Sequence, residues 1–252
     1  MICAIMQPTY YPWLGYFDMM DQCDKFILLD DVQLVKQSWH LRNRIKTANG
    51  SLFISIPIKK NLPYNKRILK LVEINYDMNW AEKHLKNIHF AYMKSPHFEE
   101  VYNFLEKFYD QKLQFLGSFN KQLIIKIGKK IGIETKILTS SSFTNIIGTK
   151  DVRLANLCKQ AKADKYLSPQ GSADYLESET PGGNLSSSGI EVYYHNYTHP
   201  VYPQLYDEFI PFMCIIDLLF NVGFKNALQV IRSGRDRNYT SQEFRKDIMK
   251  IS

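Results

Sequence analysis

The chain has 252 residues, of which 45% are hydrophobic and 23% charged, which excludes a mostly disordered protein. Its formal charge of +7 favours anionic partners, such as nucleic acids, nucleotide-sugars or anionic membrane surfaces. The cations are scattered, without a basic block or an RNA-binding aromatic motif, so we expect no sequence-specific nucleic-acid binding. The longest apolar run is too short to span a bilayer, so we expect no transmembrane segment.

The cysteines and the first residues indicate the compartment. The four cysteines form no C-x-x-C pair, so we assign no metal site. Each lies in an apolar context, and reduced buried thiols suit a cytoplasmic protein. Met1 leads directly into an apolar run, without the segments of a signal peptide. We therefore expect a cytoplasmic protein.

The first residues predict a strand, a loop, a helix and a second strand. Ile2–Met6 and Lys25–Leu29 are apolar runs of strand length. A loop rich in proline, glycine and aromatic residues lies at 7–16, and Asp30 and Asp31 follow the second run. Parallel strands end at one edge of an α/β sheet, where ligands bind, so the loop and the aspartates are expected to face one crevice.

Each of these features also has a purely structural interpretation. A loop of this composition is often a tight turn packed on its own rings. Adjacent aspartates after a strand are often a solvated turn or a helix cap. Their succession within one βαβ unit favours a binding site.

The segment 39–46 combines an aromatic residue, an amide and three cations. Arg42, Arg44 and Lys46 alternate, so they share one face if the segment is extended. Arginine binds phosphate with two parallel hydrogen bonds, and the segment therefore predicts a cradle for a diphosphate. The alternative is a solvated cationic strand edge that prevents aggregation.

The middle of the chain changes from strands to helices. After the turn signal Asn49-Gly50 we expect a strand at Ser51–Ile58, with another candidate at Lys70–Ile74. A helical insertion is expected at about 78–130, because apolar residues recur at helical spacing. Its three helices are expected at Trp80–Lys94, Phe98–Phe108 and Leu113–Gly128.

The second half repeats the opening pattern. Strands are expected at Glu134–Leu138 and Asp164–Leu167, with a helix at Asp151–Ala163 between them. Both strands end in small polar loops, in which Ser140, Ser168 and Gly171 offer donors to a phosphate. The same residue types are also ordinary turn formers. The stretch Thr180–Ser188 is either a mobile loop over the site or a hairpin tip.

The last third contains a strand, a rigid loop and an apolar helix. The strand is expected at Ile190–His195 and the helix at Phe212–Asn221, ending by Gly223. Asp217 lies within this helix, so it is either paired with a structural partner such as an arginine or used in chemistry. From Arg232 the charged tail is expected to fray.

The alternation of elements predicts an α/β fold, with one domain over 1–252 and a helical insertion. We expect a mostly parallel, Rossmann-like sheet built from about 1–60 and 130–200. The opening unit resembles that of HUP-type, nucleotidyltransferase-like folds. Enzymes of that kind use a paired-histidine loop, and the corresponding region, Pro12–Tyr16, has no histidine. This departure argues against adenylyl-type catalysis.

Five motifs carry a second resemblance, which spans nearly the whole chain. They are QPTYYPWLGYF, KFILLDDVQ and SWHLRNRIK in the first 46 residues, KYLSPQGSADYL at 165–176, and YTHPVYPQLYDEFIPFMCIIDLLFNVG at 197–223. In this order they closely resemble the WbqC-like proteins. Members of that family tend to be encoded among genes for O-antigen and other surface polysaccharides. The resemblance therefore implies a pathway more firmly than a reaction.

Three functions remain open. The first is an enzyme of O-antigen or lipopolysaccharide biosynthesis that transfers an acyl or aminoacyl group, from an activated donor, to a nucleotide-linked aminosugar. The second is a nucleotidyltransferase-like enzyme of glycan precursor synthesis. The third is a non-catalytic partner that binds a sugar nucleotide. The sequence indicates no oligomeric state and no certain cofactor.

The first function assigns roles to the candidate residues. Arg42, Arg44 and Lys46 would hold the diphosphate, and Asp31 or His199 would be the general base. Repulsion between the adjacent aspartates is expected to raise the pKa of one of them. The other candidate binding residues are Gln7, Tyr10, Trp13, Gly15, Asp30, Gln33, Trp39, Asn43, Ser140, Ser168, Gly171, Tyr175, Tyr202, Gln204, Asp217 and Asn221, with Tyr10, Trp13 and Tyr202 as stacking rings.

Overall fold

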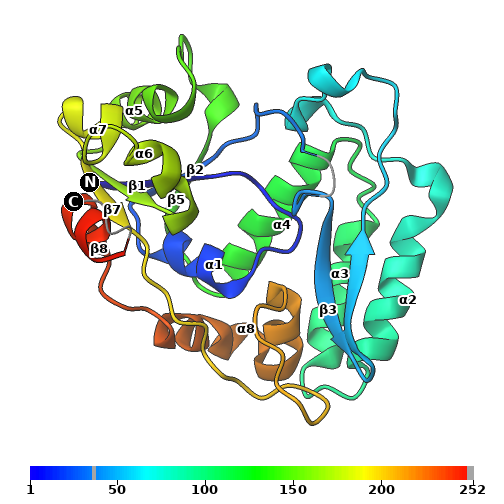
Figure 1. Cartoon of the computed structure of the whole chain (residues 1–252). Coiled ribbons are helices and arrows are strands. Elements are labelled where there is room, and N and C mark those ends of the chain that lie inside the picture. The colour runs from blue at the N-terminus through cyan, green and yellow to red at the C-terminus, as the bar shows by residue number, and fades with distance from the viewer. Residues whose placement is uncertain (36–37, 249–252) are drawn as a thin grey trace.

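The computed structural model describes residues 1–35 and 38–248, and over these ranges it contains a six-stranded sheet (Figure 1). The strands lie in the order β5-β2-β1-β6-β7-β8. The first five of them in chain order run parallel, and β8 pairs antiparallel with β7. The prediction of an α/β fold with a mostly parallel sheet is confirmed. The bounds are β1 (Ile2–Met6), β2 (Lys25–Leu28), β5 (Lys136–Thr139), β6 (Lys165–Ser168), β7 (Glu191–Tyr194) and β8 (Tyr239–Thr240).

Helices cover both faces of this sheet. On one face lie α1 (Leu14–Asp21) and α8 (Ile215–Ser233), and on the other α5 (Lys150–Gln160), α6 (Ala173–Leu176) and α7 (Gly183–Ser187). Side chains alternate along β1, so Ala4 enters one apolar core while Cys3 and Ile5 enter the other. Strands buried on both faces read as continuous apolar runs, which is why β1 and β2 could be predicted.

The segment between β2 and β5 forms a separate layer, on the right in Figure 1. It contains the antiparallel hairpin β3 (Arg42–Thr47) and β4 (Gly50–Ser55), the short turns η1 (Tyr64–Lys66), η2 (Leu69–Leu71) and η3 (Tyr76–Met78), and the helices α2 (Trp80–Tyr92), α3 (Phe98–Tyr109) and α4 (Leu116–Lys130). The three predicted helices are confirmed. Two expectations for this segment are wrong. The strand at Ser51–Ile58 pairs with β3 outside the parallel sheet, and Lys70–Ile74 is not a strand.

A break divides α8 at Gly223, which has φ 74° and ψ 166°. A Cβ on this residue would lie 2.6 Å from Nδ1 of His97, so the position requires glycine. The prediction that the helix ends near Gly223 is therefore right for its first segment, but a second segment continues to Ser233.

The described C-terminal residues are packed, contrary to the expected fraying from Arg232. After β8 come α9 (Ser241–Glu243), which starts with a capping box from Thr240, and η6 (Phe244–Ile248). The fully buried carboxylate of Glu177 accepts hydrogen bonds from the hydroxyls of Tyr194 and Ser241, both 2.6 Å long. The stretch Thr180–Ser188 contains α7 rather than a hairpin tip.

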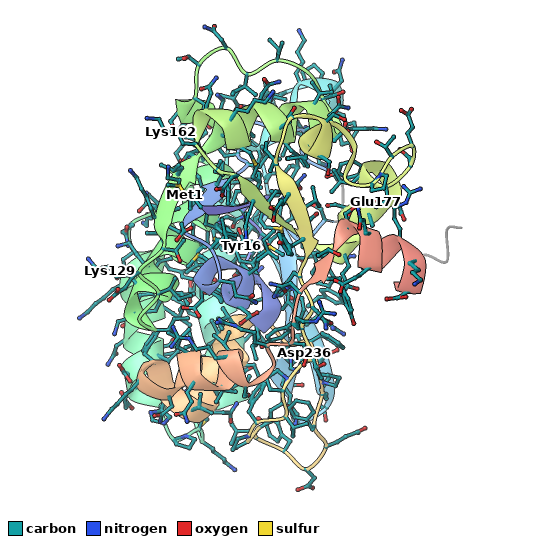
Figure 2. All side chains as sticks on the ribbon, turned by 90° about the vertical axis from the view of Figure 1, so that its left-hand side faces the viewer. Met1, Tyr16, Lys129, Lys162, Glu177 and Asp236 are labelled. Atoms are coloured by element: carbon teal, nitrogen blue, oxygen red, sulfur yellow. The ribbon has the colours of Figure 1, made fainter. Side chains whose placement is uncertain are left out.

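Side chains fill the space between the layers. Figure 2 shows Tyr16 near the centre of its view and Lys129 and Lys162 at the outer edge, in agreement with the 3% exposure of Tyr16. Over the described residues, no helix combines the length and apolarity needed to cross a membrane.

Candidate functional site

A cavity of about 310 Å³ lies at the carboxyl end of β1. At this point the strand order reverses, because β1 lies between β2 and β6. Ligands of open α/β sheets bind at such a crevice. The cavity is lined by Met6, Thr9, Pro12, Trp13, Tyr16, Trp39, Asn43, Arg44 and Phe212. Of these, the sequence analysis had named Trp13, Trp39, Asn43 and Arg44.

Aromatic rings form two walls of the cavity. Trp13 packs against Phe212, with ring centroids 5.7 Å apart, and lies nearly parallel to the ring of His199 at 6.4 Å. Trp39 stacks against Phe53 of β4 at 6.3 Å. Trp39 and Phe212 are each 51% exposed, so they present open ring surface. Such walls suit a base or a sugar ring.

Arg44 brings a positive charge to the cavity. Its Nη2 donates a weak hydrogen bond to the carbonyl of Phe212, 3.3 Å away, and its buried Nε has no partner among the described atoms. Nη1 makes no hydrogen bond to the described residues and is not among their sealed polar atoms, so the guanidinium keeps donors available for an anion. Arg42 lies nearby in sequence, with Cζ 4.8 Å from the centre of the Phe53 ring.

Lys46, the third cation of the expected cradle, is engaged elsewhere. It is only 2% exposed, and its Nζ donates to the carbonyls of Tyr206 and Glu208. The ammonium is thus used to hold the loop between β7 and α8. Arg42 and Arg44 remain as the cations of the expected cradle.

Tyr10 faces the helical layer instead of the cavity. Nε2 of His84 donates to the carbonyl of Ser55, so its Nδ1 must accept the hydrogen bond from the Tyr10 hydroxyl, at 3.0 Å. The Tyr109 hydroxyl lies 2.5 Å from that of Tyr10. Asn43 donates to the carbonyls of Tyr10 and Tyr11, which pins the loop after β1 onto β3.

Other predicted residues of the opening act indirectly. The Gln7 side chain is exposed, and its carbonyl accepts the Tyr16 hydroxyl, which fixes a ring of the cavity. Gly15 leaves room for the Trp13 indole. Gln33 is exposed and donates to the carbonyl of Tyr64, away from the cavity.

The two aspartates lie at the carboxyl edge with Ser140, as expected, but both are paired with cations. Asp30 is 1% exposed and contacts Lys121 Nζ at 2.6 Å. Burial alone would raise the pKa of Asp30, but Lys121 and Ser141 outweigh it and hold the pKa below its usual value. The expectation that repulsion raises a pKa is therefore wrong for Asp30.

Asp31, the first of the two proposed bases, is held on both oxygens. Oδ1 accepts the Ser140 hydroxyl at 2.6 Å, and Oδ2 pairs with Arg153 at 2.7 Å. A carboxylate in this position needs to leave its partners before it can accept a proton from a substrate. The contacts favour a structural role for Asp31.

His199, the other proposed base, uses both ring nitrogens. Nδ1 donates to the carbonyl of Pro200 at 3.0 Å, and Nε2 accepts the backbone N–H of Phe212 at 3.1 Å. Partial burial lowers its pKa, as expected for a neutral ring. His199 thus supports the wall formed by Trp13 and Phe212.

The four predicted residues near the C-terminus form a buried network behind this wall. Asp217 is fully buried and accepts hydrogen bonds of 2.8 Å from Tyr92, Tyr202 and Gln204. Burial raises the pKa of Asp217. Asn221 joins the loop to α8, since its Oδ1 accepts the Leu205 N–H. Hydroxyl and amide donors, and not the suggested arginine, bind Asp217.

The predicted residues at and after the end of β6 lie at the same sheet edge as Asp31, as predicted, but outside the cavity. The Ser168 hydroxyl donates to the carbonyl of Pro169, and Gly171 has open space where a Cβ would project. Tyr175 lines a different, polar cavity with Asp151 and Asp174.

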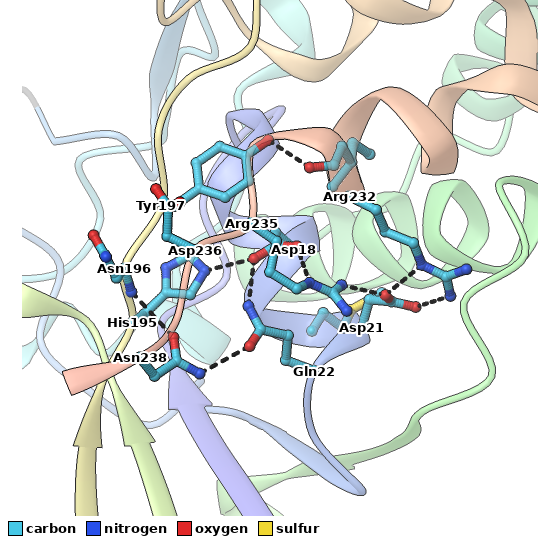
Figure 3. Close-up of polar contacts among 12 residues, drawn as sticks. Asp18, Asp21, Gln22, His195, Asn196, Tyr197, Arg232, Arg235, Asp236 and Asn238 are labelled. Atoms are coloured by element: carbon cyan, nitrogen blue, oxygen red, sulfur yellow. Dashed lines mark hydrogen bonds and ion pairs between the residues drawn. The ribbon is translucent and has the colours of Figure 1, made fainter. Parts of the chain in front are cut away.

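The sequence analysis missed a pair of residues at this edge, Asp18 and His195. Nε2 of His195 lies 2.7 Å from Oδ2 of Asp18 (Figure 3). The sequence did contain a signal for this pair. His195 follows the strand β7, just as the predicted site residue Asp30 follows β2. The sequence analysis also missed Met6, Thr9, Pro12, Tyr16 and Phe212, although all of these except Met6 lie within the quoted motifs.

The matches to known proteins extend over nearly all of the residues that line the cavity. The model of the WbqC-like protein family matches residues 7–229. The chain belongs to this family. It is also 35% identical over 222 residues to a Mycobacterium tuberculosis protein named Uncharacterized protein Rv1507c, which covers 87% of this chain and 93% of that protein. No solved structure matches the chain significantly.

Proposed function

We propose that this WbqC-like protein is an enzyme of bacterial surface-polysaccharide biosynthesis, in the O-antigen or lipopolysaccharide pathway. Its reaction is the transfer of an acyl or aminoacyl group, from an activated donor, to a nucleotide-linked aminosugar. Family membership supports the pathway. The proposal includes a cytoplasmic location and a single domain over 1–252.

The position of the aromatic cavity is the observation that carries this proposal. If the sheet strands are numbered along the chain, their spatial order is 3-2-1-4-5-6. This is the order of Rossmann-like nucleotide-binding sheets, and the cavity lies beside its reversal point. The antiparallel β8 departs from an all-parallel sheet. The order supports a Rossmann-like or HUP-like origin for the fold.

The cavity walls supply the expected contacts. Arg44, with Arg42 beside it, binds the diphosphate, and Trp39 and Trp13 stack against the base or the sugar. The net charge of +7 favours the approach of such an anion.

A thermal-shift panel tests the ligand class. Nucleoside diphosphates, nucleotide-sugars with an uncharged sugar, and nucleotide-aminosugars, each with a uracil, thymine or guanine base, are added to the whole protein. We expect one nucleotide-aminosugar to raise the Tm most, because a ligand that binds only the native state stabilises it. Lys129→Ala, an exposed change on α4, is the control and keeps the shift. A panel without any shift contradicts the proposal.

Two alternatives have observations in their favour. The strand order supports a nucleotidyltransferase-like enzyme, which is distinguished by release of pyrophosphate from a nucleoside triphosphate. The pairing of both Asp31 and His199 supports a non-catalytic sugar-nucleotide-binding partner. Turnover of a nucleotide-aminosugar with an acyl donor excludes this second alternative.

A further inference from the structure

His195 and Asp18 form a fixed pair beneath the carboxyl edge of the sheet. His195 directly follows β7, and its backbone is held by the last residue of β6 and by the loop after it. Its N–H donates to the carbonyl of Ser168 at 2.8 Å, and its carbonyl accepts Gln170 Nε2 at 3.0 Å. The side chain is 6% exposed. The backbone of His195 is therefore fixed by the end of β6 and by the loop that follows it.

Asp18 is fully buried on α1 and is bound by three donors. These are His195 Nε2 at 2.7 Å, Gln22 Nε2 at 2.5 Å and Arg235 Nε at 2.9 Å (Figure 3). Arg235 also pairs with Asp21, which Arg232 binds through two hydrogen bonds of 2.8 Å. The carboxylate is thus locked in place, with its charge balanced by an arginine.

This arrangement binds Nε2 of His195 to Asp18 and leaves Nδ1 able to accept a proton. A carboxylate only accepts, so Nε2 carries the proton of the bond to Asp18. Nδ1 makes no hydrogen bond to the described residues, and it is not among their sealed, unpartnered polar atoms. A histidine held by a carboxylate on one nitrogen, with the other nitrogen open, has the geometry of a general base.

Three other histidines do not offer such a nitrogen. Both ring nitrogens of His84 and of His199 are engaged in hydrogen bonds. In His40, Nδ1 contacts the Ser38 hydroxyl, and Nε2 is sealed without a partner. With Asp31 held by Arg153, His195 is the best-oriented base at this edge.

His195 lies within reach of a ligand that starts in the aromatic cavity. Two strand spacings separate β7 from β1, which is about 10 Å along the sheet edge. Tyr197 stacks on His195 and also contacts Trp13 of the cavity, each at 5.6 Å between ring centroids. The open space at Gly171 lies in the loop after β6, between these strands. A nucleotide-linked sugar is longer than this distance.

We propose that His195, oriented by Asp18, is the general base of the transfer reaction, a role that rests on the proposed function. The substrate lies along the edge from the cavity to β7, with its sugar amine at His195. Nδ1 takes a proton from the amine while the nitrogen forms its bond to the acyl carbon of a thioester or ester donor. The bond from that carbon to the leaving group breaks, and the imidazolium returns the proton to the leaving thiolate or alkoxide.

Nitrogen NMR on protein labelled with ¹⁵N-histidine tests the base without any assay of activity. In the neutral ring we expect the proton on Nε2, and the His195→Gln variant assigns the His195 signals. The surrounding charges are Asp18 and Asp21 on α1, and Arg232 and Arg235 at and after the end of α8. A neutral ring protonated on Nδ1 overturns the proposal.

Kinetics of the same variant test the role in turnover. Glutamine keeps a side-chain N–H for Asp18 but cannot accept the proton, so we expect kcat to fall by about 10²–10⁴-fold with little change in KM or Tm. The control, Arg232→Ala, loses bonds to Asp21 but none to Asp18. A His195→Gln variant with near-normal kcat refutes the role. If the wild-type protein turns over no nucleotide-aminosugar, the proposed function fails. The NMR experiment still decides whether Nδ1 of His195 is the nitrogen that can accept a proton.

Discussion

Trp13 and Gly15 are sterically matched at the start of α1. A Cβ on residue 15 would lie 2.5 Å from Cζ2 of the Trp13 indole, so the ring occupies the space that glycine leaves. Trp13 is the residue that connects the cavity to His199, Phe212 and Tyr197. The absence of a side chain at Gly15 therefore shapes the wall of the site.

This match predicts the effect of Gly15→Ala. The added methyl group displaces the indole, with an overpacking cost of about 1–3 kcal/mol. We expect a lower Tm, altered tryptophan fluorescence and a weaker nucleotide-sugar shift. Gly171→Ala is the matched control for stability, because a Cβ there meets no atom within 4 Å. Equal melting of the two variants contradicts the steric argument.

Arg44 and Lys46 are predicted to behave differently, although they share a face of β3. Arg44→Ala removes a charge-assisted hydrogen bond, so a nucleotide-diphosphate ligand should bind about 1.5–3 kcal/mol more weakly. Lys46→Ala removes a buried ammonium that holds the loop at 206–208, so it should mainly lower the Tm. Calorimetric titration and melting of both variants separate the two effects. Binding that is indifferent to Arg44→Ala removes the cradle.

Asp31→Asn distinguishes the structural from the catalytic role of this carboxylate. Asparagine can still accept from Ser140 but loses the ion pair with Arg153, a partly exposed pair (22% and 20%) that contributes about 1 kcal/mol. We expect a small loss in Tm and near-normal turnover. A drop in turnover of about 10²–10⁴-fold, at unchanged Tm, restores Asp31 as the general base in place of His195.

Two buried histidines predict a loss of stability in acid. Burial lowers the pKa of His84 and of His40 to about 4. The unfolded chain, with pKa values of about 6.5, binds more protons below that pH, so the free energy of unfolding falls from pH 6.5 towards pH 4. At pH 5 each histidine should cost about 2 kcal/mol relative to pH 7.

Urea unfolding at pH 7 and pH 5 measures this effect. The double variant His40→Gln, His84→Gln is expected to be less stable at pH 7, because the bond between residue 84 and Tyr10 is changed. Its stability should nevertheless depend less on pH than that of the wild-type protein. An unchanged pH dependence in the double variant shows that other groups cause the acid sensitivity.

The sequence predicted the parallel sheet well, because each central strand is an apolar run followed by turn residues. It also predicted that Arg42, Arg44 and Lys46 share a face, but not that Lys46 is covered. That covering comes from Tyr206 and Glu208, about 160 residues further along the chain. Local periodicity carries no information about such contacts.

The same limit explains the error about the aspartates and the omission of His195. The pair Asp30-Asp31 is visible in the sequence, but its cations, Lys121 and Arg153, come from distant helices. His195 appears as the last residue of a strand, and its partner Asp18 is 177 positions away. The residue types indicated which side chains lie at the carboxyl edge of the sheet. Which partners they bind there depended on the fold.

A crystal structure with the nucleotide-aminosugar that gives the largest thermal shift tests the central claim most directly. We expect the diphosphate beside Arg44, a ring against Trp39 or Trp13, and the sugar amine near Nδ1 of His195. Ligand found away from this edge, for example in the polar cavity beside Tyr175, would contradict the proposed site and the reaction derived from it.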